Sequence, residues 1–336
     1  MMRPVAPGES IQRALDEAGP GARIVLAEGV HAENVWIRHP GVTLTGAGPG
    51  RTVLVPGEGV PSGVPSLHDA PDDVVSGVTV YGESVSDVRI QGLTVRGFTG
   101  AGVYAHSADG VTVHDVTAED NAVWGVYLRE CVNGRITDCR ANGSQYGGAA
   151  FSFCPLSDHL LAGNETHGNA FGVFIDNSSG VKAVRNTCHG NAIGMMLLNQ
   201  VYEGEPEGGV TDCLVAANDF YDNGLVAGVE PDGLGAAGPP ISGVGLALIG
   251  THRVSVVDNH IHDNHPGGES VMGAALVISS SSGWGGDHAL DNHVLWNRVY
   301  GNTPLDYQFD ADLDRQTLAA NTADKGDPPD ARGWRR

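Results

Sequence analysis

Positive charge is scarce in this sequence of 336 residues. Lys and Arg together number 19 against 40 Asp and Glu, and the only lysines are Lys182 and Lys325. The formal net charge is therefore −21, and the pI is near 4.8. Binding to nucleic acid or to an anionic membrane needs clustered Lys and Arg that neutralise phosphate groups. The composition argues against both partners, and against a highly anionic polymer as substrate.

Long apolar runs are also missing. The sequence has no stretch of 18 or more apolar residues that could form a transmembrane helix, and its first ten residues contain no apolar segment of the length that a secretory signal needs. The five cysteines, at positions 131, 139, 154, 188 and 213, are an odd number that does not suit a disulfide framework. We therefore expect a cytoplasmic protein with reduced cysteines.

Glycine, in contrast, is abundant, with 49 residues, and it marks an internal repeat. Short apolar segments begin at Gly102, Gly125, Gly148, Gly172, Gly194, Gly245 and Gly273, at successive steps of 23, 23, 24, 22, 51 and 28 residues. A period of about 22 to 25 residues is too short for helical pairs or propeller blades. Short β-branched strands separated by Gly and Asn indicate one coil of β-structure per repeat.

A second signature lies between these strands, namely two asparagines five residues apart. It occurs at Asn164/Asn169, Asn186/Asn191, Asn218/Asn223, Asn259/Asn264 and Asn297/Asn302. Together with the Gly-led strands, the asparagine pairs favour a parallel β-helix in which each repeat forms one coil.

On these residues the sequence resembles the right-handed parallel β-helix proteins of the pectin-lyase-like superfamily, in which stacked coils carry asparagine ladders at their turns. The resemblance covers about residues 8–325. It implies an all-β, single-domain right-handed parallel β-helix solenoid. In that solenoid we expect an N-terminal capping helix at about 8–20, coils at 22–303, and a polar C-terminal cap or tail at 304–336.

The capping helix also follows from the residues themselves. Ser10 is a suitable N-cap, Gly19 a suitable stop, and Ile11 and Leu15 share one face with Ala14 and Ala18. Three insertions are expected to leave the coils near 56–73, 200–209 and 225–242. Long insertions in solenoids tend to lie on the binding face.

Strand alternation predicts which side chains of the Gly-led strands point outward. The residue after each glycine is apolar and should face the core, so the next residue and the one two further on should face solvent. This face carries the predicted acid, base and charge-stabilising residues, which are His106, Arg129, Tyr127, Asp176, Tyr104 and Glu130. A Tyr or His could transfer a proton while Arg129 neutralises a carboxylate or enolate.

Beside this polar patch the same face becomes apolar. The predicted substrate-binding residues are Phe174, Met196, Leu198, Ser152, Ile249 and Trp124. Roofed by the insertions at 200–209 and 225–242, the face is expected to form a pocket for a ligand with a polar head and an apolar tail.

A second candidate site is a ladder of aromatic rings, which we call the His/Tyr ladder. Its members lie two residues before the second asparagine of each pair, and they are His167, His189, Tyr221, His262 and Tyr300. Stacked imidazoles could ligate a metal, but the ladder lacks the carboxylate or Cys that would complete a tetrahedral site. We interpret it as structural stacking, and we predict no metal and no cofactor.

The resemblance implies β-elimination, epimerisation or glycoside hydrolysis without selecting one. The Gly-His-Gly and Arg-Ile-Lys motifs of polygalacturonase-like hydrolases are absent. The sequence therefore favours an intracellular isomerase, cyclase or lyase that acts by acid–base catalysis on a small, partly apolar substrate. One alternative is a lyase, epimerase or hydrolase acting on an oligosaccharide. The other is a non-catalytic binding or scaffold solenoid. Expected partners are a small-molecule or sugar-derived substrate and a second copy of the chain, bound through the apolar part of the groove or the insertions.

Overall fold

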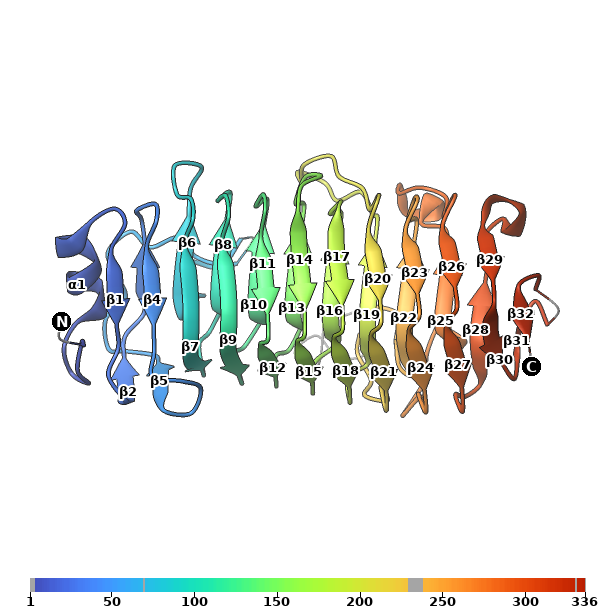
Figure 1. Cartoon of the computed structure of the whole chain (residues 1–336), viewed down its shortest axis with the longest axis horizontal. Helices are drawn as coiled ribbons and strands as arrows, with labels where there is room; N and C mark the ends of the chain where they lie inside the picture. The colour runs from blue at the N-terminus through green and yellow to red at the C-terminus, as the bar shows by residue number, and fades with distance from the viewer. Residues whose placement is uncertain (1–3, 69, 229–237, 330, 336) are drawn as a thin grey trace.

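The computed structural model describes residues 4–68, 70–228, 238–329 and 331–335. Within these residues the chain winds into an elongated solenoid whose strands pair in parallel from coil to coil (Figure 1). Outside the described residues lie residues 1–3, residue 69 and residues 229–237 of the two insertions expected at 56–73 and 225–242, and residues 330 and 336 of the expected C-terminal tail. No helix in the described ranges is long and apolar enough to cross a membrane.

Two sheets run the length of the solenoid. The smaller sheet consists of β3 (Val35–Ile37), β6 (Val78–Tyr81), β8 (Ala101–His106), β10 (Trp124–Arg129), β13 (Gly147–Ser152), β16 (Phe171–Asp176), β19 (Ile193–Leu198), β22 (Val244–Ile249), β25 (Ala274–Ser279), β28 (Leu305–Phe309) and β31 (Gly326–Asp327). We call it the long-strand sheet, because most of its strands contain six residues.

The second sheet takes two short strands, or one long bent strand, from each coil. It consists of β1 (Arg23–Val25), β2 (Gly29–Ala32), β4 (Thr43–Thr45), β5 (Thr52–Val55), β7 (Arg89–Arg96), β9 (Thr112–Glu119), β11 (Arg135–Thr137), β12 (Arg140–Asn142), β14 (His159–Ala162), β15 (Glu165–His167), β17 (Val181–Val184), β18 (Thr187–His189), β20 (Leu214–Ala216), β21 (Asp219–Tyr221), β23 (Ser255–Val257), β24 (His260–His262), β26 (His293–Leu295), β27 (Arg298–Tyr300), β29 (Thr317–Ala319), β30 (Asn321–Ala323) and β32 (Trp334–Arg335). Two short 3-10 helices, η1 (Ser282–Trp284) and η2 (Leu313–Arg315), lie in loops. Strands thus continue beyond residue 303, where we expected the coils to end.

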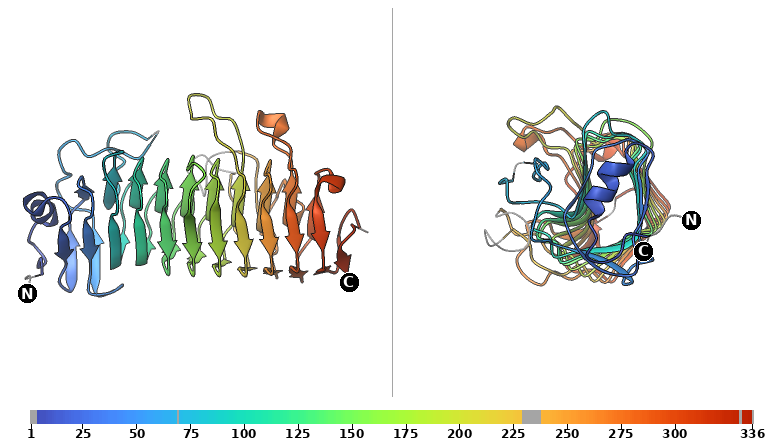
Figure 2. Two further views of the ribbon diagram at one scale, coloured as in Figure 1. Left: turned by 45° about the horizontal axis from the view of Figure 1, so that its top comes forward. Right: turned by 90° about the vertical axis from the view of Figure 1, so that its left-hand side faces the viewer.

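The predicted N-terminal helix is confirmed as α1 (Ile11–Ala18). The Ser10 side chain accepts a hydrogen bond from the Arg13 backbone N–H, and Gly19 ends the helix with a positive φ of 71°. Ile11 and Leu15 are buried against the first coils. The helix lies across the N-terminal end of the solenoid (Figure 2), where it covers the core that the first coil would otherwise expose.

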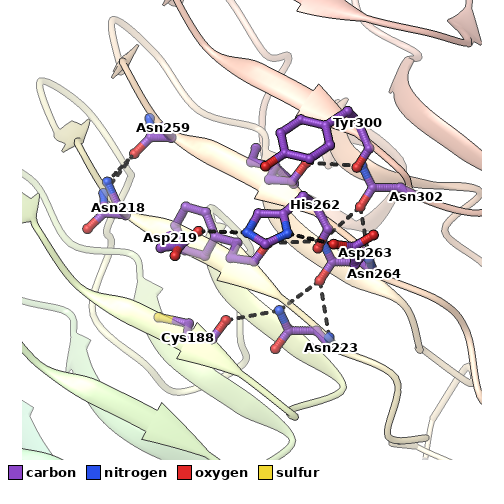
Figure 3. Close-up of polar contacts among 12 residues, drawn as sticks. Cys188, Asn218, Asp219, Asn223, Asn259, His262, Asp263, Asn264, Tyr300 and Asn302 are labelled. Atoms are coloured by element: carbon purple, nitrogen blue, oxygen red, sulfur yellow. Dashed lines mark hydrogen bonds and ion pairs between the residues drawn. The ribbon is translucent and has the colours of Figure 1, made fainter.

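The predicted asparagine ladders are confirmed, and both are buried. In the second ladder, Asn191 Oδ1 accepts hydrogen bonds from the backbone N–H and Nδ2 of Asn169, and Asn191 Nδ2 donates in turn to Asn223 Oδ1. The same pattern links Asn218, Asn259 and their neighbours in the first ladder (Figure 3). The amides replace the backbone partners that the chain loses where it turns.

The glycines of the repeat lie beside the second ladder. They are the second residue of most long-strand elements rather than the first, so β10 begins at Trp124 and not at Gly125. A Cβ atom on Gly125 would lie 2.4 Å from the carbonyl oxygen of Gly148 in the next coil. Close approach between coils therefore explains the repeated glycine.

The predicted stacking of the His/Tyr ladder is confirmed. Its ring centroids lie 5.0 to 5.4 Å apart from His167 through His189, Tyr221 and His262 to Tyr300. His262 also contacts the carboxylates of Asp219 and Asp263 (Figure 3). In the described part of the chain, no three His, Cys, Asp or Glu side chains lie close enough together to hold a metal ion.

Candidate functional site

The predicted site residues lie in two rows on the outer face of the long-strand sheet. The strand register pairs His106 with Arg129, Arg129 with Ser152, and Ser152 with Asp176 across β8, β10, β13 and β16. Tyr104, Tyr127, Ala150 and Phe174 form the parallel row two residues earlier. The predicted alternation is therefore confirmed, since the residues that alternate with these rows, such as Val126 and Leu128, belong to the solenoid core.

The prediction that this face meets solvent is wrong. His106 is 8% exposed, Arg129 2%, and Asp176 6%. The reason is that chain segments fold over the sheet, and Leu67, from the insertion between β5 and β6, packs into a second apolar cluster on the outer face. The insertions between β5 and β6 and between β19 and β20 extend from one side of the solenoid (Figure 2). Loops cover the face as expected, but the insertion between β5 and β6 also packs onto it, and Leu67 is buried there.

Arg129 is at the centre of the polar half of this face. Its Nε lies 3.2 Å from Oε1 of Glu130, and its Nη2 donates to Oε2 of Glu205. The guanidinium also stacks on Phe153, with 4.6 Å between Cζ and the ring centroid. A buried guanidinium can bind an anionic ligand group, but here the carboxylates of Glu130 and Glu205 already compensate its charge.

Three residues that contact the candidate site were missed by the sequence prediction, and all come from the covering loops. Glu205 and Tyr202 lie in the segment 199–213 between β19 and β20, and His68 lies in the segment 56–77. His68 Nε2 lies 3.1 Å from Glu205 Oε1, so these two loops meet over Arg129. Only the expected insertions pointed to these residues, because nothing in a loop sequence indicates which side chain reaches the sheet.

His106 is held as a neutral imidazole. Its Nε2 lies 3.2 Å from Glu130 Oε1, while its buried Nδ1 has no hydrogen-bond partner among the described residues. Burial lowers the pKa of His106, and the contact with Glu130 opposes that shift only in part. In the tautomer whose Nε2–H group donates a hydrogen bond to Glu130, Nδ1 keeps a lone pair that can accept a proton.

The pKa of Asp176 shifts in the opposite direction from that of His106. Burial raises the pKa of its carboxyl group to about 7, although Arg129 and the Tyr202 hydroxyl both act to lower it. Tyr202 Oη donates to Asp176 Oδ1 across 3.5 Å. Burial also raises the pKa of Tyr127 to about 12, although Arg129 and Ser152 both act to lower it, so this phenol remains protonated. The face therefore combines a neutral base with a carboxyl group that is partly protonated near pH 7.

The apolar half of the face continues across later coils. Met196, Leu198 and Ile249 are buried in the same outer cluster as Phe174 and Trp124. Trp124 stacks on Tyr127, with ring centroids 5.0 Å apart, and lies nearly parallel to Phe174 at 6.1 Å. The structure thus brings the predicted polar and apolar residues together on one face.

Two cavities lie away from this face. One of about 410 Å³ is lined by residues of the C-terminal coil, including Tyr307, Lys325 and Trp334. The other, of about 280 Å³, lies on the second sheet, the one made of the shorter strands, beside Asp138 and Arg140. Neither contains a predicted site residue.

Comparisons with known proteins agree with the architecture. The family model described as right-handed beta helix region matches residues 76–283. No curated protein matches the sequence. Among solved structures, the A-module of mannuronan C-5 epimerase AlgE4 from Azotobacter vinelandii is similar at 17% identity and a TM-score of 0.62, covering 93% of this chain and 88% of that one.

Two further structures are similar over most of their length. The periplasmic alginate epimerase AlgG has 14% identity and a TM-score of 0.55, with 94% of this chain and 81% of that chain covered. DFA-IIIase from Arthrobacter chlorophenolicus A6, in complex with GF2, has 14% identity and a TM-score of 0.58, with 96% and 91% covered. At these identities the likeness shows the shared fold.

Proposed function

The chain belongs to the right-handed β-helix family, and from that premise we propose that it is a carbohydrate-modifying enzyme that transfers a proton at a carbon next to a carboxylate. The single observation that carries the proposal is Arg129, a buried cation on the outer face of the sheet with His106 on one neighbouring strand and Tyr127 beside it. Such an arrangement suits stabilisation of the negative charge that develops when a C–H bond beside a carboxylate breaks.

The roles follow from the surroundings of each group. His106 Nδ1 takes the proton from carbon, and the electron pair moves toward the ligand carboxylate as an enolate held by Arg129. In an epimerisation a proton returns to the opposite face of the carbon from a second acid. In a β-elimination the electron pair forms a double bond to the next carbon, the C–O bond to the leaving group breaks, and the leaving oxygen takes a proton.

Charge limits the size of the acidic substrate. A row of like charges along a polymer would need several cations, whereas this face offers Arg129 and the whole chain has a net charge of −21. We therefore propose a substrate with one carboxylate at the reacting sugar, such as a short uronide, rather than a polyuronate. The structural neighbours named as alginate and mannuronan epimerases support this class of chemistry through their fold.

The test is a product screen on short uronides and neutral glycans, read by mass spectrometry and by the ultraviolet absorbance of unsaturated sugar. Wild type, Arg129→Gln and Arg140→Gln are compared, because Arg140 is an exposed arginine on the other sheet and serves as the matched control. We expect turnover of a uronide that falls at least 100-fold in Arg129→Gln and is unchanged in Arg140→Gln. Equal activity of the two variants would refute the proposal.

A second candidate function is isomerisation or cyclisation of a small, partly apolar molecule, which is favoured by the buried cluster of Met196, Leu198 and Ile249. This second function would be favoured if no glycan were turned over and an apolar carboxylic acid were. A scaffold role predicts no turnover at all. The cytoplasmic location, the absence of a cofactor and association of two copies through the apolar part of the face remain predictions.

A further inference from the structure

Glu205 approaches Arg129 from a covering loop and not from the sheet. It lies 76 residues after Arg129 in sequence, and its side chain is 12% exposed. Its Oε2 accepts from Arg129, and its Oε1 lies 3.1 Å from His68 Nε2. One carboxylate is therefore held between a guanidinium below and an imidazole on the opposite loop.

Arg129 already has a carboxylate partner of its own. Glu130 follows it directly in the chain and contacts both Arg129 and His106. Glu205 thus brings a second negative charge to the same cation. Without a ligand, a buried guanidinium that faces a vacant position would be costly, so an internal carboxylate suits that position.

The loop is attached to the solenoid independently of its tip. Asn177 exchanges two hydrogen bonds with the backbone of Gln200, at 2.7 and 3.1 Å, and Ser179 Oγ donates to the Gly209 carbonyl oxygen at 2.9 Å. Between these anchors, Tyr202 and Glu205 bond to the candidate site residues Asp176 and Arg129. The tip can therefore leave the sheet while the base of the loop stays in place.

We infer that Arg129 and His68 form a binding site for a ligand carboxylate, that Glu205 fills this site when no ligand is present, and that a ligand carboxylate takes it in exchange for Glu205. The inference rests on the proposed function, in which Arg129 receives the carboxylate of an acidic sugar. It adds His68 as a second ligand-binding residue and identifies the 199–213 loop as the segment that moves.

The test measures binding apart from turnover. Calorimetry with D-glucuronate, and with D-glucose as its neutral counterpart, compares wild type, Glu205→Gln and Glu203→Gln. Glu203 is an exposed residue on the same loop, so its substitution changes the charge equally without touching Arg129. We expect Glu205→Gln to bind glucuronate at least tenfold more tightly than Glu203→Gln, with glucose bound at least tenfold more weakly than glucuronate.

Adding His68→Leu to Glu205→Gln should abolish most of that gain. Because Glu205→Gln could disturb folding, hydrogen exchange of wild type gives an independent test, in which glucuronate and not glucose should accelerate exchange at residues 201–208. Equal affinities of the two Gln variants, or a loop that exchanges no faster with glucuronate, would overturn the inference. If Glu205→Gln binds glucuronate tightly but wild type turns over no uronide, the proposed function alone is refuted. If wild type turns over a uronide but Glu205→Gln gains no affinity for glucuronate, the exchange of Glu205 for a ligand carboxylate alone is refuted.

Discussion

His106 Nε2 lies 3.2 Å from Glu130 Oε1, and the opposite ring nitrogen of His106 is buried without a partner among the described residues. This arrangement suits a general base. The Glu130 carboxylate holds Nε2 of His106 and thereby fixes the orientation of the ring, which determines where the lone pair of Nδ1 points. Glu130 also contacts Arg129, so base and cation are held by one carboxylate.

Replacement of this base should separate activity from stability. We expect His106→Gln to lower kcat at least 100-fold on the uronide that wild type turns over, since general base catalysis contributes about 10² to 10⁴. His293→Gln is the matched control, because His293 is exposed on β26. Steady-state kinetics measures kcat of each variant, and a thermal melt checks its stability. A loss of kcat in both variants, or in neither, would count against His106 as the base.

Asp176 should make stability fall as pH rises. Its folded-state pKa of about 7 is above its ordinary value of 3.8, so the folded protein holds this proton more tightly between those two values. Below pH 3.8 the carboxyl group is protonated in both the folded and the unfolded state, and the protein then has the highest free energy of unfolding that this group allows. That free energy falls as the pH rises from 3.8 through 7. We expect Asp176→Asn to be more stable than wild type at pH 8, by at most about 4 kcal/mol.

Urea unfolding at pH 5 and pH 8 measures this difference, which should shrink at the lower pH. Asp72→Asn on an exposed part of the 56–77 segment is the control, and it should have the stability of wild type at both pH values. A gain in Asp176→Asn that is equal at pH 5 and pH 8 would contradict a raised pKa.

The asparagine ladder should be a major source of stability. Asn191 is fully buried and hydrogen-bonds to Asn169, Asn223 and the carbonyl oxygens of Thr166 and His189. Asn191→Ala leaves several buried groups unpaired, at about 1 to 3 kcal/mol each, so we expect a loss of about 3 to 5 kcal/mol.

Chemical denaturation of Asn191→Ala and Asn142→Ala measures this loss. Asn142 is a partly exposed asparagine on β12, so its replacement should cost no more than about 0.5 kcal/mol. Similar losses in the two variants would show that the ladder contributes no special stability.

The repeat explains why much of the site could be predicted. The nearly equal steps of 22 to 24 residues between the Gly-led strands from Gly102 to Gly194 set the register. Alternation within each strand then places His106, Arg129 and Asp176 in one row on one face. The prediction needed only which side of a strand each residue takes, and that is a local property of β-structure.

What covers that face could not be predicted in the same way. Glu205 and His68 meet although they are 137 residues apart, and neither lies in a repeating segment. Alternation states that Arg129 points away from the core, but it does not state whether a loop or water lies above it. The expected exposure was wrong for that reason, and the pKa shifts of Asp176 and His106 follow from the covering.

The most direct test of proton transfer beside Arg129 is the incorporation of solvent deuterium. Short uronides are incubated in D₂O with wild type, Arg129→Gln or Arg140→Gln, and the mass of the recovered sugar is measured. We expect wild type and Arg140→Gln to place one deuterium at the carbon next to the carboxylate, or to form an unsaturated product, and Arg129→Gln to do so at least 100-fold more slowly. Turnover that neither breaks this C–H bond nor depends on Arg129 would contradict the proposed chemistry.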